Sequence, residues 1–578
     1  MEQRTRNAFK YLVFWEEIKL TQPRKKAFRV NRDYPKILRN RKQRIARRLD
    51  PKRRWSEQPG PMMKASNIHF EMAERGRALN YGGIGAIHLM GQRLGLAEEI
   101  DSRLQLLKRH LPYHESDHVL NLAYNALLDG QRLEDIELRR NDEAFLDGLG
   151  AQRIPDPTTS GDFTRRFNQD SVLELMEAIN ATRQRVWEKQ PRDFLQQAFI
   201  DTDGTLAGTL GECKGGMALS YKGIWGYAPL IVTLANTREV LYLVNRPGNV
   251  VSHEGCVPWI DRAIELLRPR AAEITLRGDT DFTLSAELDR WDGQGIKFIF
   301  GMDAHPKVVQ LAESLPETAW KPLERLARCE IATEPRRKPQ RVKDAIVRFK
   351  GYTNKKLVGE SVTEFNYQPI KCGRSYRLVV VRKNISVQKG EMVLLEDIKY
   401  FFYITNHSAY CAEQIVALSN ERCDQENVIE QLKNGVNAMR MPVDDLLSNW
   451  AYMVMSALAW NLKAWYGLLM PNRQRGLELL GMEFRRFLHL IVLLPAQIVR
   501  SGRRIIYRIM GYNSWLKDFF ASWENLRRMA PARKQADSQI SCGSRASDRF
   551  FSSENTAFQQ QSIGTRSIHN TYILSYFI

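Results

Sequence analysis

Three aspartates stand at places in the sequence where an α/β domain presents groups for chemistry. Asp201 and Asp203 end the apolar run at 198–203, and the two-residue period of a strand puts both side chains on one face. Asp279 comes just after the run at 273–277, and ligand sites in open α/β sheets gather at such strand ends. Taken singly, each aspartate is more typical of a turn or a helix cap than of a metal ligand. Their chemistry therefore depends on what lies near them.

A predicted helix at 419–435 adds a carboxylate between two cations. Arg422, Glu426 and Lys433 are offset by 0, 4 and 11 residues. At roughly 3.6 residues per turn these positions fall within about 40° of one another. This order of cation, carboxylate and cation along one helix face suits a metal ligand placed between two phosphate contacts. The alternative is a solvated helix face with pairing between residues four apart.

These residues resemble the motifs of DDE transposases of bacterial insertion sequences. The spacing of Arg422, Glu426 and Lys433 matches the signature Tyr-(2)-Arg-(3)-Glu-(6)-Lys, which marks the third carboxylate of the largest such group. Ser419 stands where that signature has its Tyr. The match makes Glu426 the candidate for the third carboxylate.

The first and second carboxylate motifs of this family have counterparts as well. Asp203-Gly-Thr205 resembles the motif Asp-x-Thr, and residues 277–282 resemble the second motif, with Asp279 in the catalytic place and Asp281 where a Gly is usual. The resemblance covers roughly residues 80–510 and is closest to the thirteen-eighty family of insertion sequences. Further similarity lies at 211–213, 246–250 and 459–462.

The resemblance implies an RNase H-like core in which Asp203, Asp279 and Glu426 are catalytic and hold two Mg²⁺ ions, with Mn²⁺ able to substitute. Such a pair activates the attacking oxygen and stabilises the leaving oxygen. Water would cleave DNA at the element end, and the freed 3′-OH would attack target DNA. Arg422 and Lys433 would contact DNA phosphates near the scissile bond.

The implied partner is double-stranded DNA, both the terminal inverted repeats of the element and the target, bound by a homodimer. Asp201 stays an alternative for the first carboxylate, because it shares a strand face with Asp203. Two other functions stay open. One is a metal-dependent DNA nuclease on the same core, and the other is a decayed transposase that binds DNA without catalysis.

The pattern of elements predicts an α/β fold: an RNase H-like mixed sheet with a β-rich insertion, flanked by an N-terminal helical domain and C-terminal helices. Short β-rich runs at 198–203, 228–234 and 240–244 precede alternating helix and strand up to 300, so the sheet should start antiparallel and continue parallel. A further strand is expected at 345–349. Helices are expected at about 410–435, 445–467 and 474–500.

Composition shifts divide the chain into seven expected parts. They are a basic, flexible arm (1–66), a helical DNA-binding domain (67–190), the first part of the catalytic core (191–310), the β-rich insertion (311–395), the last core strand with the Glu-bearing helix (396–440), a C-terminal helical region (441–530) and a disordered tail (531–578). The helical part could read DNA through a helix-turn-helix, or could be an ordinary bundle.

Charge and cysteine content fit this assignment. The chain of 578 residues carries 86 Lys and Arg against 66 Asp and Glu, a formal charge of +20, which favours a polyanionic partner. Residues 23–54 hold fifteen Lys and Arg against two Asp, as an arm on phosphates would. The seven scattered Cys include no C-x-x-C, which argues against a zinc ribbon and fits a reducing cytoplasm. We therefore expect a cytoplasmic protein associated with the nucleoid.

Overall fold

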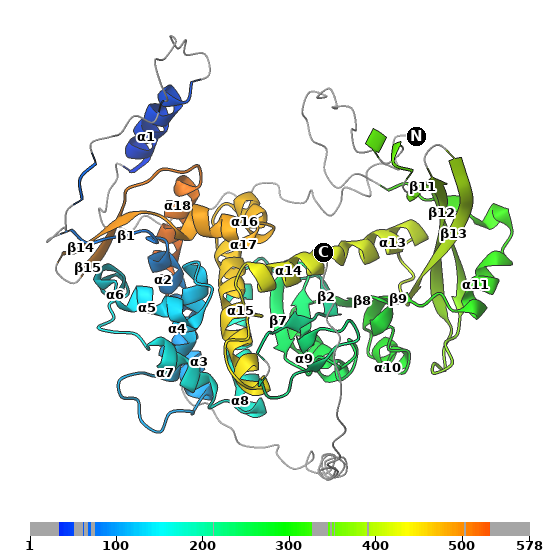
Figure 1. The fold of residues 1–578 in the computed structure, drawn as a ribbon, viewed down its shortest axis with the longest axis horizontal. Coiled ribbons are helices and arrows are strands. Elements are labelled where there is room, and N and C mark those ends of the chain that lie inside the picture. The colour runs from blue at the N-terminus through cyan, green and yellow to red at the C-terminus, as the bar shows by residue number, and fades with distance from the viewer. Residues whose placement is uncertain are drawn as a thin grey trace, which may run out of the picture. The chain divides into compact units, whose positions relative to one another are not determined.

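A nine-stranded mixed sheet is the centre of the fold (Figure 1). The structure is a computed structural model that describes residues 34–50, 62, 68–70, 76–211, 213–325, 345–346, 349–351, 353–389, 392–501 and 504–531. The strands lie in the order β10-β11-β12-β13-β9-β8-β2-β6-β7. Their bounds are β2 (Gln197–Gly204), β6 (Leu230–Leu234), β7 (Glu239–Val244), β8 (Glu273–Gly278), β9 (Lys297–Met302), β10 (Lys321–Pro322), β11 (Thr353–Tyr367), β12 (Tyr376–Lys389) and β13 (Met392–Thr405).

The pairing directions confirm the predicted sheet. Strands β2, β6 and β7 are antiparallel, whereas β2, β8 and β9 are parallel. Every residue of β6 and β7 is buried, as expected for apolar runs covered on both faces. Helix α9 (Val257–Leu267) packs against β2, β6 and β7 and carries the chain across to β8. The fold is thus mixed α/β with a large mixed sheet, consistent with an RNase H-like core.

Three long antiparallel strands, β11 to β13, extend this sheet beyond β9. Most of this extension falls in the expected β-rich insertion, although β13 continues to Thr405. The strand expected at 345–349 is wrong, because residues 345, 346 and 349 are helical and exposed. Trp320 is buried, with the Arg382 guanidinium 4.4 Å from its ring centre, so it serves packing here.

Helices surround the β2–β7 end of the sheet. Helix α15 (Leu446–Leu468) is buried on almost every side and contacts both β7 and the helices α4 and α8. None of the described helices is long and apolar enough to cross a membrane. The N-terminal helices are α2 (Ile84–Leu94), α3 (Leu96–Arg103), α4 (Glu115–Leu127), α5 (Ile136–Arg140), α6 (Glu143–Leu149), α7 (Pro157–Thr164) and α8 (Gln169–Trp187).

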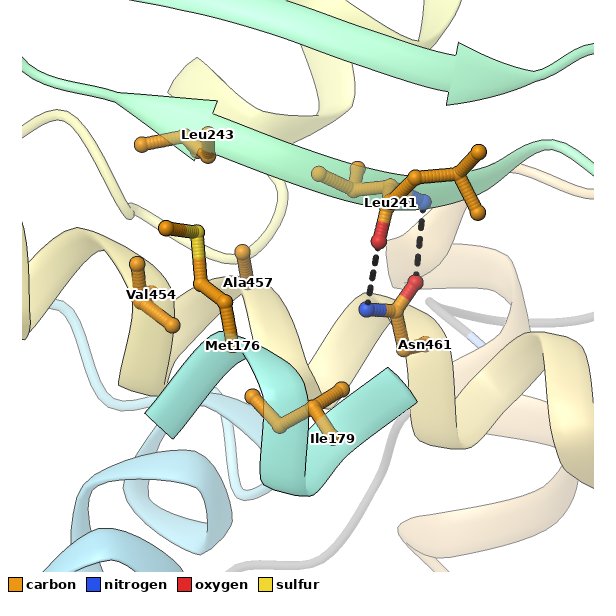
Figure 2. Close-up of a pocket in the computed structure, with 8 residues that line it drawn as sticks. Met176, Ile179, Leu241, Leu243, Val454, Ala457 and Asn461 are labelled. Atoms are coloured by element: carbon orange, nitrogen blue, oxygen red, sulfur yellow. Dashed lines mark hydrogen bonds between the residues drawn. The ribbon is translucent and has the colours of Figure 1, made fainter. Parts of the chain in front are cut away.

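Strand β7 is an edge strand, and side chains of α15 satisfy its outer backbone groups. Asn461 exchanges two hydrogen bonds with Val240: its Nδ2 donates to the carbonyl at 3.0 Å, and its Oδ1 accepts from the N–H at 2.9 Å (Figure 2). Trp460 Nε1 donates to Arg238 O at 2.6 Å. Because unpaired edges invite pairing with other chains, this cover closes the sheet on that side. The small cavity beside Asn461 is otherwise lined by apolar side chains such as Met176 and Leu241, and belongs to the core.

The third helix expected in the C-terminal region, at 474–500, is wrong over much of its length. Helix α16 (Arg473–Leu480) stops at Gly481, and α17 (Phe484–Phe487) leads into a short π-helical turn. Pro495 then precedes β14 (Ala496–Ser501), which pairs with β15 (Arg504–Ile509) and with β1 (Ala78–Leu79). The helix prediction failed because this pairing joins segments more than 400 positions apart.

Part of the basic arm expected to be flexible is also helical. Helix α1 (Tyr34–Arg48) contacts the C-terminal elements: Arg41 Nη1 donates to Ile509 O at 3.1 Å and to Gly511 O at 2.7 Å. The Tyr34 ring stacks on Phe520 of α18 (Leu516–Arg528), with centroids 4.8 Å apart. The remaining positions of the arm are mostly outside the described residues, as is the expected disordered tail from residue 532.

Candidate active site

Asp203 lies at the end of β2 and contacts a cation from a distant part of the sequence. Its Oδ2 is 3.2 Å from Nη1 of Arg422, and both side chains are largely buried. Arg422 sits between α13 (Ala412–Glu421) and α14 (Cys423–Asn434) with helical backbone angles. Burial raises the pKa of Asp203 to about 6; Arg422 opposes this rise, and the charge of Asp279 adds to it. The predicted first carboxylate and the first predicted cation are therefore together.

Asp279 follows β8, the parallel neighbour of β2, so it lies at the same edge of the sheet as Asp203. Its Oδ1 accepts a hydrogen bond from the N–H of Asp281 at 3.0 Å and caps a short turn. Burial raises the pKa of Asp279, Arg422 lowers it, and Asp281 raises it. Asp279 thus caps a turn, as aspartates at the start of a helical turn often do. The charge of Arg422 acts on both Asp279 and Asp203.

Glu426 lies on α14, one helical turn beyond Arg422, and is exposed. Its neighbour Gln425 is buried and fixes the start of α14 on the sheet, because its Nε2 donates to Asp201 O at 3.1 Å and to Ile231 O at 3.0 Å. Across the described ranges, the oxygens of Asp203, Asp279 and Glu426 do not form a set in which all lie within 4.8 Å of one another. Glu426 is therefore on the helix that contacts β2, but the three carboxylates do not form a compact set.

Lys433, on the last turn of α14, is the second predicted cation. Burial lowers its pKa, Glu430 raises it, Lys222 lowers it, and Asp203 raises it. Lys433 is therefore close enough to Asp203 for their charges to interact.

Asp201, the alternative first carboxylate, has a different environment. Its side chain is 1% exposed and forms two bonds with Arg277, Oδ1 to Nε at 2.6 Å and Oδ2 to Nη2 at 2.8 Å. Arg277 Nη1 also donates to Leu418 O at 2.8 Å, which ties α13 to this pair. Both oxygens of Asp201 are thus already engaged inside the protein, whereas Asp203 faces the strand end.

Two residues of this site were not singled out from the sequence. Arg277 neutralises Asp201, and a cation at the end of the β-rich run 273–277 was the available signal. Gln425 gave no signal, because a polar residue on a helix is ordinarily solvated and its buried position depends on how α14 meets β2.

The side chains at this edge fit a hard divalent cation. Carboxylate oxygens are the ligands that Mg²⁺ prefers. The pKa values of Asp203 and Asp279 are raised chiefly by burial, which the charge of Arg422 offsets only in part, and the charge of Asp279 adds to the rise at Asp203. A bound cation would stabilise the charged form of both carboxylates.

Comparison with known proteins gives a family match over most of the chain. A family model described as Transposase DDE domain group 1 matches residues 63–531. No curated protein matches the chain. Matching solved structures include the cryo-EM structure of a piggyBac transposase synaptic complex with hairpin DNA, at 12% sequence identity and a TM-score of 0.30, covering 82% of this chain and 91% of that one.

Proposed function

The chain belongs to the family of transposases with a group 1 DDE domain, and we propose that it cleaves DNA at the ends of an insertion sequence and joins the freed 3′-OH to target DNA. The observation that carries this proposal is the meeting of Asp203, Asp279 and Arg422 at one edge of the sheet. These residues come from three distant segments, each of which bears one of the family's motifs. The thirteen-eighty family of insertion sequences is the group whose motifs they fit.

In this proposal Asp203, Asp279 and Glu426 are the catalytic residues and hold Mg²⁺, or Mn²⁺ in its place. Bound metal supplies Lewis acidity and an activated oxygen nucleophile at neutral pH. Asp203 and Asp279 are held by β2, β8 and a capped turn, so they need little reorganisation to receive a cation. Glu426 completes the set from α14.

Arg422 and Lys433 position the DNA. A guanidinium has five N–H donors, and the contact of Arg422 with Asp203 at 3.2 Å uses one of them. Lys433 lies near enough to Asp203 to sense its charge. A phosphate entering between these cations is thereby placed beside the carboxylates, with backbone contacts that carry no sequence information.

The proposed partners are the double-stranded terminal repeats of the element and its target DNA, bound by a homodimer in the cytoplasm at the nucleoid. The formal charge of +20 supports a polyanionic partner. We assign end recognition to the helical region at 67–190 and DNA holding to the strands of the 311–395 insertion. The core is formed by 191–310 and 396–440.

A joining assay separates a transposase from a nuclease on the same core. The full chain is incubated with Mg²⁺, a labelled duplex that ends in a pre-cut 3′-OH of the element's inverted repeat, and a supercoiled target plasmid. We expect label to become covalently attached to the plasmid, and Asp279→Asn to abolish the product while the matched Asp281→Asn retains it. Hydrolysis of an uncut end in a parallel reaction, without joining of the pre-cut end, would identify a nuclease. Neither activity, with end binding intact, would identify a decayed transposase.

A further inference from the structure

A second group of metal-type ligands lies apart from the carboxylate site, where the loop after α3 meets the start of α4. His110, His114 and Glu115 each offer one ligand atom, and these three atoms all lie within 4.8 Å of one another. His110 Nε2 is 3.1 Å from Glu115 Oε2. The two imidazole rings are stacked with centroids 4.4 Å apart. These three residues match none of the sequence motifs described above.

The Glu115 carboxylate is held in place with one oxygen left over. Its side chain is 1% exposed, and Oε1 accepts hydrogen bonds from the backbone N–H groups of Leu106 at 3.0 Å and Leu107 at 2.9 Å. Its Oε2 is buried and accepts no hydrogen bond, although His110 Nε2 lies close by. Burying a carboxylate oxygen without a partner costs free energy, so we expect a cation beside Oε2 of Glu115.

The surroundings add negative charge and rigidity. Asp101 is near enough to Glu115 for the two charges to repel, and it is fixed by hydrogen bonds from the N–H and hydroxyl of Ser116 at 2.8 and 2.9 Å. The backbone N–H of His114 donates to Asp117 Oδ2 at 2.9 Å, which holds the first turn of α4. Metal sites typically have hydrogen-bonded groups of this kind around the ligands, which hold the ligands in place.

We propose that His110, His114 and Glu115 form a binding site for a divalent transition-metal ion of the zinc class, with solvent completing the coordination. Two imidazole nitrogens and one carboxylate oxygen suit such an ion, whereas Mg²⁺ prefers oxygen alone. Ligand atoms around a tetrahedral Zn²⁺ lie about 3.4 Å apart, so the 3.1 Å pair is already close to that spacing.

The ion would tie the loop at 104–114 to α4. Both histidines are exposed, which gives the ion a path of entry from solvent. The site lies in the helical region at 76–187 and uses none of the proposed catalytic residues. It is therefore independent of the proposed function, and the two can fail separately.

Zinc titration of the full chain tests this site. Protein freed of metal with a chelator, its thiols alkylated, is titrated with ZnCl₂ by calorimetry in excess Mg²⁺, which occupies the carboxylate site. We expect one Zn²⁺ per chain. His110→Ala and, separately, Glu115→Gln should weaken binding at least about tenfold, whereas His489→Ala, which removes an exposed imidazole elsewhere, should leave it unchanged.

A second readout excludes loss of folding as the cause. Co²⁺ in place of Zn²⁺ should give a visible absorption band that His110→Ala removes, while metal-free thermal unfolding of that variant matches the parent chain. The proposal is overturned if the parent binds no Zn²⁺, if His110→Ala and Glu115→Gln bind as tightly as the parent, or if His489→Ala weakens binding equally.

Discussion

At the scale of single residues, two neighbouring aspartates at the site have different partners. Asp201 and Asp203 share a strand face, as the sequence period predicts. Arg277 forms two bonds with Asp201, whereas Asp203 meets Arg422 at the strand end. The period of a strand determines which face a side chain takes, but the choice of internal partner depends on β8 lying beside β2. The sequence therefore left both aspartates as candidates, and their contacts in the structure differ.

The buried pair of Asp201 and Arg277 predicts a large effect on stability. Arg277→Met leaves the Asp201 charge buried without its partner, which should lower the free energy of unfolding by about 3–5 kcal/mol. The matched change Arg290→Met breaks a half-exposed pair with Asp261 and should cost less than about 1 kcal/mol. Urea unfolding followed by circular dichroism measures both. Equal losses for the two variants would contradict the role given to Arg277.

A buried histidine predicts how stability depends on pH. His118 on α4 stacks on Phe163 at 4.3 Å between ring centroids, and burial lowers its pKa from 6.5 to about 4. Between pH 6.5 and about 4 the unfolded chain therefore binds a proton at this histidine that the folded chain does not. The contribution of neutral His118 to the free energy of unfolding is fully present above pH 6.5 and is lost as the pH falls towards 4.

The His118→Phe variant isolates this contribution. It should lose less stability between pH 7 and pH 4.5 than the parent, by up to about 3 kcal/mol. Other buried histidines, such as His407, remain in both proteins and cancel in the comparison. Unfolding free energies of parent and variant across this range provide the measurement. Parallel curves would mean that His118 is already protonated in the fold or not buried.

At the scale of elements, the strands that could be predicted are those with a clear apolar pattern in their own local sequence. The runs that form β2, β6, β7, β8 and β9 are apolar and bounded by turn residues, so the core sheet with its change from antiparallel to parallel was predictable. Strand β14 was not predicted, because its partner β1 is remote and the stretch is apolar enough to suggest a helix. Gly481 and Pro495 were the available signals against one continuous helix. Helix α1 was missed for a related reason: it is held by Arg41 and Tyr34 rather than by an apolar stripe.

The cover of the β7 edge by α15 gives a prediction at this scale. Asn461→Leu keeps the size of the side chain but leaves the buried N–H of Val240 without its partner, which should cost about 1–3 kcal/mol. Asn434→Leu, at an exposed position of α14, should stay within about 0.5 kcal/mol of the parent. Chemical denaturation measures both. If Asn461→Leu is as stable as the parent, its two hydrogen bonds do not hold α15 on β7.

At the scale of the whole molecule, a large excess of positive charge accompanies a small acidic site. The formal charge of +20 favours DNA as a partner, while Asp203 and Asp279 place two negative charges at one edge of the sheet. Overall charge and motif order were readable from the sequence and indicated the family. The exposure of Glu426 could not be predicted from the sequence, because it depends on how Gln425 attaches α14 to the sheet.

The exposed cations of α1 predict a change in the salt dependence of DNA binding. Changing Lys42, Arg44 and Arg47 to Gln leaves the docking residues Tyr34 and Arg41 in place. Binding to element-end and scrambled duplexes should weaken by similar factors, and the slope of log K against log salt should fall by about 0.9 for each lost phosphate contact.

Paired salt titrations of the parent, the triple variant and a chain starting at Ser56 measure this effect. An unchanged slope in both altered proteins would remove the arm from DNA binding. A loss confined to the element-end duplex would instead make α1 a reader of sequence.

The central claim is that Asp203, Asp279 and Glu426 act together on DNA, and Glu426 is the member that the contacts secure least. The most direct test is Mg²⁺-dependent cleavage of an element-end duplex by Glu426→Gln beside Glu430→Gln, a matched change one turn further along α14. We predict that Glu426→Gln abolishes cleavage while gel-shift binding without metal stays at the parent level, and that Glu430→Gln cleaves normally. Cleavage by Glu426→Gln at the parent rate would contradict the account.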